Sequence, residues 1–257
     1  MNRVVLVTGA CGGIGSVLCK RFLEAGDTVL ALDVDAVALE GLVVELGADR
    51  VTPVAADLGD AAEVSEAVSR AVAARGPVDV LVANAGGAQS GTLATTDAAS
   101  WHRDVHLNLD GTYHTVEAVR ASMIERQRGA IVLIGSVNGM TALGHPAYSA
   151  AKAGLISYTK ALAIELGRHG IRANIVCPGT VKTQAWQARA AKNPQVFETL
   201  KKWYPLGDFA TPDDIADAVM FLASPMARMI TGVALPVDGG LMAGNRLMAG
   251  ELTLESF

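Results

Sequence analysis

The chain has 257 residues, of which 51% are hydrophobic, so it is long enough for one large domain with a sizeable core. Its net charge is −5 and no basic cluster stands out, which argues against a nucleic-acid-binding face or a patch for anionic membranes. No apolar run reaches the roughly 20 residues of a membrane span. The three cysteines show no CxxC spacing, so we expect no disulfide framework and no structural metal, and we interpret the chain as soluble and cytoplasmic.

The first predicted element is a buried strand over residues 4–7, followed by a glycine-rich turn and a helix that ends near Gly26. Gly9, Gly13 and Gly15 let backbone amides approach a pyrophosphate closely, and the start of the helix supplies positive potential. The spacing is G-x3-G-x-G rather than the commoner G-x-G-x-x-G. Glycine-rich turns also occur in α/β proteins without a nucleotide, so the loop alone leaves that alternative open.

The second strand covers residues 28–32 and ends at Asp33, close to the offset from the glycines that is expected of an acid that binds the adenosine ribose. A carboxylate there accepts a hydrogen bond from the 2′-OH and repels a 2′-phosphate. Two like charges ~4 Å apart at an effective dielectric of ~20 cost on the order of 4 kcal/mol. No Arg or Lys lies in the glycine loop or directly after Asp33, so we predict NAD rather than NADP. The alternative is that Asp33 only caps the next helix.

The third and fourth strands are predicted at residues 51–56 and 78–83. Asp57 follows the third strand and either faces the adenine or caps a helix that starts near Asp60. Asn84-Ala85-Gly86-Gly87 follows the fourth strand, and small residues there again permit close backbone approach.

Residues 97–128 predict a long helix that bends near Gly111. His102 and His106 are four residues apart in it, but no third ligand is evident, so we expect exposed or interface histidines and no metal. A fifth strand over residues 130–135 leads into Ser136.

The following helix, which we expect to reach about residue 168, carries Tyr148 and Lys152 one turn apart on the same face. A free tyrosine titrates near pH ~10 and is a poor proton donor or acceptor at neutral pH. A lysine cation one turn away favours the phenolate and lowers the pKa of the phenol. The pair therefore suits the exchange of an alcohol proton, although Tyr and Lys on an Ala-rich helix are also common as plain surface residues.

The sixth strand covers residues 171–177 and stops at Pro178-Gly179. Residues 180–210 have mixed polarity and predict a mobile, partly helical lid, Thr211 begins another helix, and residues 233–237 form the last strand. Strand and helix alternate without a linker or a repeat. We therefore predict an α/β fold in a single domain over residues 1–257, a Rossmann-type, doubly wound, parallel seven-stranded sheet with helices on both faces.

From Val4 to Gly240 the chain resembles the short-chain dehydrogenase/reductase family. The motifs that carry the resemblance are residues 8–15, Asn84-Ala85-Gly86, Asn108, Ser136, Tyr148-x3-Lys152 and Pro178-Gly179. The resemblance implies hydride transfer at a nicotinamide coupled to proton transfer. It also implies that Tyr148 exchanges the proton, Ser136 orients the substrate oxygen, Lys152 binds the nicotinamide ribose, and Asn108 holds a water against Lys152.

The resemblance further implies which residues line NAD. Gly12 stands where NADP-preferring members often have Arg, which supports NAD, and Ala130 and His169 stand where carrier-protein-dependent reductases have basic docking residues. We therefore keep a 3-oxoacyl-thioester reductase only as an alternative function. The implied cofactor-binding residues are Gly9, Gly12, Gly13, Ile14, Gly15, Asp33, Asp57, Leu58, Asn84, Ala85, Gly86, Tyr148, Lys152, Pro178, Gly179, Val181 and Thr183.

The predicted substrate pocket mixes aromatic walls with hydrogen-bonding groups, which favours a small polar secondary alcohol or its ketone, such as a sugar or hydroxy-acid derivative. Its expected residues are Ser136, Val137, Asn138, His145, Tyr148, Gln184, Trp186, Gln187, Trp203 and Tyr204. The alternative is that the Trp residues only pack the lid onto the core. The rivals from other classes are a non-catalytic NAD-sensing or scaffold protein and a SAM-dependent methyltransferase, neither of which needs Tyr148 and Lys152.

Family resemblance implies a homotetramer in which the helices of Asn108 and Tyr148 pair between subunits. The tail over residues 241–257 is rich in Leu and Met, which suggests docking on a neighbouring subunit. We hypothesise that Arg246 or Glu251 reaches the neighbour's pocket.

Overall fold

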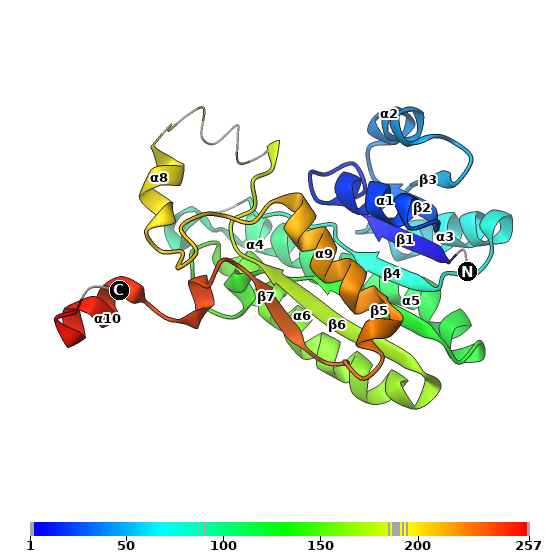
Figure 1. Cartoon of the computed structure of the whole chain (residues 1–257). Coiled ribbons are helices and arrows are strands. Elements are labelled where there is room, and N and C mark those ends of the chain that lie inside the picture. Colours follow the sequence, from blue (N-terminus) through cyan, green and yellow to red (C-terminus); the bar gives the residue numbers. More distant parts are fainter. Residues whose placement is uncertain are drawn as a thin grey trace.

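The computed structural model of the protein describes residues 3–89, 91–184, 186, 191, 193 and 195–255 (Figure 1). Its seven strands are all parallel and form one sheet in the order β3-β2-β1-β4-β5-β6-β7. This order confirms the predicted Rossmann-type sheet. The strands are β1 (Val4–Thr8), β2 (Thr28–Asp33), β3 (Val51–Ala55), β4 (Val80–Ala83), β5 (Gly129–Ile134), β6 (Ile171–Pro178) and β7 (Ala234–Val237).

Helices cover both faces of the sheet, as predicted (Figure 1). One face packs against α1 (Gly15–Glu24), α2 (Ala36–Leu46) and α9 (Pro212–Ala223). The other packs against α3 (Ala61–Arg75), α5 (Gly111–Glu125) and α6 (Pro146–Leu166). The remaining labelled helices are α4 (Ala98–Val105), α8 (Val196–Lys201) and α10 (Arg246–Thr253). Within the described ranges, no helix has the length and apolar content that a membrane crossing requires.

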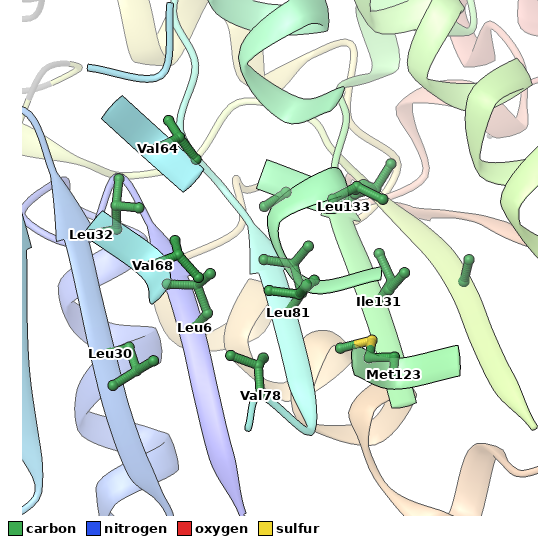
Figure 2. Packing of buried hydrophobic residues seen from close by; sticks show 14 of the residues in the cluster. Leu6, Leu30, Leu32, Val64, Val68, Val78, Leu81, Met123, Ile131 and Leu133 are labelled. Carbon is green, nitrogen blue, oxygen red and sulfur yellow. The ribbon is translucent and has the colours of Figure 1, made fainter. Parts of the chain in front are cut away.

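The core consists of two apolar layers because successive strand residues point to opposite faces of the sheet. Leu6 and Leu81 point toward α3 and α5, whereas Val5 and Val7 point toward the helices of the opposite face. Figure 2 shows the first layer, where Met123 of α5 closes over the strand side chains. Burial of such a side chain contributes about 1.5–3 kcal/mol. Both faces of the central strands are therefore apolar, which explains their continuous hydrophobic runs.

The predicted long helix over residues 97–128 is interrupted. α4 ends at Val105, residues His106–Asp110 form a π-helical turn, and α5 begins at Gly111, where we predicted the bend. α4 packs against α6, whereas α5 packs against α3. The wide turn lets the two halves face different helices, and it contains Asn108.

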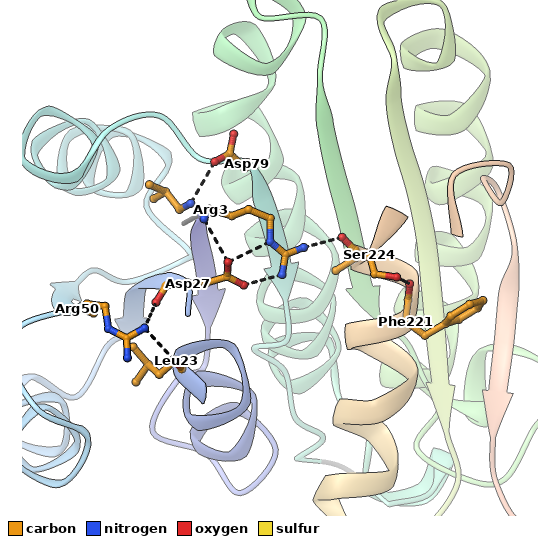
Figure 3. A network of polar contacts seen from close by, with 9 residues as sticks. Arg3, Leu23, Asp27, Arg50, Asp79, Phe221 and Ser224 are labelled. Carbon is orange, nitrogen blue, oxygen red and sulfur yellow. Dashed lines mark hydrogen bonds and ion pairs between the residues drawn. The ribbon is translucent and has the colours of Figure 1, made fainter. Parts of the chain in front are cut away.

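A polar network ties the amino ends of the strands to α9 (Figure 3). The Arg3 backbone N–H and side-chain Nε both donate to the Asp27 carboxylate, at 3.2 and 3.1 Å, and the Arg3 guanidinium also donates to the carbonyl of Ala223. Asp27 is only 2% exposed, so its charge depends on this partner. Asp79 accepts a hydrogen bond from the Val4 backbone at 3.1 Å.

Candidate active site

The glycine loop lies where the strand order reverses, between β1 and β4, and open α/β sheets bind ligands at such a point. Gly9 has φ +61°, in the left-handed region that favours glycine. A Cβ atom on Gly15 would lie 2.0 Å from the Gly9 carbonyl oxygen, so only glycine fits there. Ile14, at the start of α1, has an apolar side chain that cannot cap the helix, so the first helix amides that no carbonyl engages, unlike that of Ser16, stay open to a ligand. The loop therefore fits the pyrophosphate of a dinucleotide.

Asp33 ends β2 beside this loop. Its carboxylate accepts hydrogen bonds from the backbone N–H of Cys11, at 3.0 Å, and of Asp35, at 3.2 Å. Asp35, not Asp33, caps α2 through the N–H groups of Val37 and Ala38, so the capping interpretation of Asp33 is wrong. Asp33 is only partly buried, which leaves its outer face available to a ribose hydroxyl.

Asn84 joins the ends of β4 and β1. Its side-chain amide donates to the carbonyls of Thr8 and Gly9, at 3.0 and 3.1 Å, and the Thr8 hydroxyl accepts the backbone N–H of Asn84 and Ala85. A Cβ atom on Gly9 would lie 2.9 Å from the Cα of Ala85, so small residues are required on both strands.

Asp57 accepts the backbone N–H of Gly59 at 2.8 Å, and Asp60 is the residue that caps α3. The capping alternative for Asp57 is therefore wrong, and its neighbour Leu58 is buried.

His106 contacts Asp110 through Nδ1 at 3.0 Å rather than pairing with His102. Across the described ranges, no three His, Cys, Asp or Glu side chains are placed to share a metal ion.

Ser136, Tyr148 and Lys152 converge from two elements. Tyr148 and Lys152 lie one turn apart on α6, and Ser136 follows β5. The Lys152 Nζ donates to the Ile134 carbonyl at 2.8 Å and lies 5.5 Å from the centre of the Tyr148 ring. The Ser136 side chain lies close enough to the Tyr148 phenol to lower its pKa. The plain-surface alternative for this pair is wrong, since Lys152 is only 2% exposed.

The electrostatics of the three groups differ from our expectation. Burial raises the pKa of Tyr148, and the hydrogen bond from Ser136 only partly offsets this effect. The predicted lowering of the phenol pKa is therefore wrong for the protein by itself, because desolvation of the phenolate has the largest effect and Lys152 is not among the groups that shift this pKa. Burial also lowers the pKa of Lys152 from 10.5 to about 8. The lysine remains mostly charged at neutral pH.

Asn108 is buried in the π-helical turn, and its side chain is engaged by the backbone. Its amide nitrogen donates to the carbonyls of Gly87 and Asp104, both at 2.7 Å, and its oxygen accepts the Gly87 N–H at 3.1 Å. A Cβ atom on Gly86 would lie 2.6 Å from this oxygen and 3.1 Å from the Lys152 Nζ. The side chains of Asn108 and Lys152 thus both approach Gly86. Asn108 therefore shapes the wall of the site beside the lysine.

A cavity of about 1080 Å³ opens above Ser136 and Tyr148. Of the predicted substrate residues, Ser136, Val137, Asn138, His145, Tyr148, Trp186, Trp203 and Tyr204 line it. Gln184 is exposed and is not among the described lining residues, and Gln187 lies outside the described part of the chain. Gly179 and Thr183, expected at the cofactor, line the same cavity, so both predicted sites meet there.

Part of the cavity wall was not predicted. It comprises Gly87, Ala88, Thr141, Leu143, Thr180, Leu200, Leu241, Met242, Gly244 and Asn245. Residues 241–245 reach the cavity because the buried Asp238 accepts the N–H groups of Gly240 and Met242, at 3.0 and 2.8 Å, and turns the chain back over the sheet. An Asp before two glycines is a turn signal that could have located this wall. Tyr204 fixes Thr180 through hydrogen bonds to its backbone N–H and hydroxyl.

Residues 9–242 match a family model described as Enoyl-(Acyl carrier protein) reductase. Among solved structures, an oxidoreductase of the short chain dehydrogenase/reductase family from Burkholderia thailandensis is 64% identical, with a TM-score of 0.95 over 100% of this chain and 99% of that one. An uncharacterised oxidoreductase from Schizosaccharomyces pombe is 45% identical over 99% of this chain and 96% of its own length.

Relatives with defined substrates are diverse. A subunit of (2S)-[(R)-hydroxy(phenyl)methyl]succinyl-CoA dehydrogenase from Thauera aromatica is 40% identical, over 95% of this chain and 98% of its own. D-threitol dehydrogenase from Mycolicibacterium smegmatis is 39% identical, over 93% and 92%. A 3-oxoacyl-[acyl-carrier-protein] reductase from Thermotoga maritima is 35% identical, over 94% and 98%.

Proposed function

Because the chain belongs to the short-chain dehydrogenase/reductase family, we propose that it is an NAD-dependent oxidoreductase that interconverts a small polar secondary alcohol and its ketone. The observation that carries the proposal is the convergence of Ser136, Tyr148 and Lys152 beside the large cavity. The polar lining residues Asn138 and His145 favour a sugar or hydroxy-acid derivative, and the similarity to D-threitol dehydrogenase supports this choice.

A bound nicotinamide would accept or supply the hydride, and its positive charge when oxidised would favour the phenolate. Tyr148 is protonated at neutral pH, since even a free phenol titrates near pH ~10 and burial raises the pKa of Tyr148 further, so it donates its proton to the carbonyl oxygen during reduction. The Ser136 hydroxyl hydrogen-bonds to the same oxygen and orients it. The Lys152 cation stabilises the phenolate that remains. Oxidation needs the phenolate first, so oxidation should accelerate with rising pH and reduction should not.

We propose NAD rather than NADP on the position of Asp33. Its carboxylate lies at the end of β2 beside the glycine loop. There it would accept a hydrogen bond from a ribose hydroxyl and repel a 2′-phosphate. The repulsion of about 4 kcal/mol corresponds to nearly three decades in affinity. The ratio of kcat/KM for NAD over NADP measures it, and Asp33→Asn should lower the ratio. A ratio near one in the unaltered protein would contradict the assignment.

The decisive test is a screen for change in NADH absorbance with polyols, hydroxy acids, hydrophobic alcohols and 3-oxoacyl thioesters. We expect turnover with the polar secondary alcohols or their ketones. Turnover confined to 3-oxoacyl thioesters would instead favour the acyl-thioester reductase, to which one relative is similar. Tyr148→Phe should abolish turnover and leave NAD affinity nearly intact, since a phenyl ring keeps the shape of the site. A protein that binds NAD but turns over none of the four classes would be a sensor or scaffold.

We also propose a cytoplasmic homotetramer in which the tail contacts a neighbouring subunit. The described cysteines are all free, which suits a reducing compartment. None of the residues of α10 is buried, and the helix projects from the rest of the chain (Figure 1). Asn245 lines the chain's own cavity, so a truncation should remove only residues 246–257, which include Arg246 and Glu251. If either side chain completes the neighbour's pocket, the truncation raises KM; unchanged kinetics would reject that role.

A further inference from the structure

A second cavity, of about 290 Å³, lies at the amino ends of the strands, opposite the candidate active site. We propose that this cavity binds a phosphate group, either free or as part of a small metabolite. Its walls come from the starts of β1, β4, β5 and β6 and from the end of α9. The lining residues are Arg3, Asp79, Val80, Arg128, Gly129, Ala130, Arg172, Ala223, Ser224 and Pro225.

The first observation is an excess of positive charge. Arg3 is matched by the buried Asp27, which it contacts with two side-chain nitrogens (Figure 3). Arg126 and Arg128 share a single acid, because both contact Asp79, at 2.7 and 3.2 Å. That pair of arginines therefore leaves one positive charge unmatched beside the cavity, which Arg128 lines and Arg126 does not. The Asp79 carboxylate also lines the cavity, but these two guanidinium groups and a backbone N–H already neutralise its charge.

The second observation is that Arg172 contributes a further charge. Its guanidinium donates to the carbonyls of Leu222, at 2.6 Å, and Ser224, at 3.2 Å, and no carboxylate pairs with it within the described ranges. Its pKa is lowered by burial. These carbonyls belong to the end of α9, and a helix end supplies only about half a negative charge. Capping the helix therefore does not account for the two unmatched positive charges around the cavity.

The geometry suits phosphate rather than a larger polyanion. Arg172 has five N–H groups, and the two carbonyls engage two of them, so the planar fork keeps donors for a second partner. Guanidinium groups bind phosphate through such paired hydrogen bonds. The cavity lies at the lower limit of ligand-sized pockets, and liquid water takes about 30 Å³ per molecule, so the volume admits a phosphate group and a short organic stem.

The test is calorimetric titration of inorganic phosphate, and separately of glycerol phosphate, into the full chain at constant ionic strength. NAD is present in excess so that, on the proposed function, it occupies the glycine loop and phosphate binding there is suppressed. We expect saturable binding that Arg128→Gln and Arg172→Gln each weaken at least about tenfold, because each removes a charged donor pair. Tighter binding of glycerol phosphate than of inorganic phosphate would identify a phosphorylated metabolite as the occupant; the reverse would identify free phosphate.

Arg70→Gln is the matched control, because Arg70 is an exposed arginine on α3 that pairs with Glu66, and neither residue lines the cavity. Its phosphate affinity should equal that of the unaltered protein. Arg172 also caps α9, so Arg172→Gln can fail to fold; Arg128, whose side chain is 64% exposed, then decides the question. The proposal is overturned if no saturable binding occurs, if Arg128→Gln binds as tightly as the unaltered protein, or if Arg70→Gln weakens binding equally. None of these results bears on the oxidoreductase activity.

Discussion

Replacing Lys152 by Met should abolish activity and stabilise the folded protein at neutral pH. The pKa of the buried Lys152 falls from 10.5 to about 8 on folding. One pKa unit corresponds to about 1.4 kcal/mol, so keeping this side chain charged in the folded state costs about 3 kcal/mol at any pH below 8. Met has a similar length and carries no charge, so Lys152→Met removes this cost.

The pH dependence identifies the cause. Between pH 8 and 10.5 the unfolded chain binds the lysine proton more tightly than the folded one, so the stability of the unaltered protein rises with pH in this window. Above pH 10.5 the lysine is neutral in both states and the cost disappears. The advantage of Lys152→Met should therefore shrink by about 3 kcal/mol between pH 7 and pH 10.5.

Urea unfolding of both proteins at the two pH values, at equal protein concentration, measures this change. The comparison across pH cancels any constant contribution, such as loss of the hydrogen bond to the Ile134 carbonyl. A stability difference that does not vary with pH would refute the reasoning, since it would mean that the lysine is not desolvated in the folded protein.

Three further changes test other features. Asp27→Ala should destabilise the protein by about 3–5 kcal/mol in urea unfolding, because it leaves the Arg3 charge without its partner; a loss below 1 kcal/mol would show that solvent screens the pair. Gly15→Ala should abolish NAD binding in a fluorescence titration, because its Cβ would lie 2.0 Å from the Gly9 carbonyl oxygen, and retained affinity would mean that the loop adjusts freely. Tyr204→Phe should raise KM for the substrate with little effect on kcat, because it removes the hydrogen bonds that hold Thr180 in the cavity wall. A fall in kcat alone would argue against this role.

Much of the fold could be predicted because its signals are local. Runs such as residues 4–7 are apolar on both faces of the sheet, and a glycine or an acid marks the carboxyl end of each early strand. The bend at Gly111 was also found, although not its π-helical geometry. Tyr148 and Lys152 were predicted to share one face of a helix because their spacing is visible in the sequence, and both lie on α6.

The remaining features depend on residues that are distant along the chain. The raised pKa of Tyr148 results from burial by several elements, which the spacing to Lys152 could not reveal. The wall formed by residues 241–245 depends on how Asp238 turns the chain. The capping roles of Asp35 and Asp60, rather than of the acids that end the strands, depend on where each helix begins.

The π-helical turn at residues 106–110 acts as a phase shift within a continuous helical segment. Each residue of an α-helix advances the chain by about 100°, so one extra residue in a turn rotates everything after it by that amount. Deleting one residue of this turn would make the helix more regular, yet it would turn the whole of α5 away from α3 and move Asn108 from its glycine neighbours. The irregular turn therefore keeps the sheet face covered and the wall beside Lys152 in place at the same time.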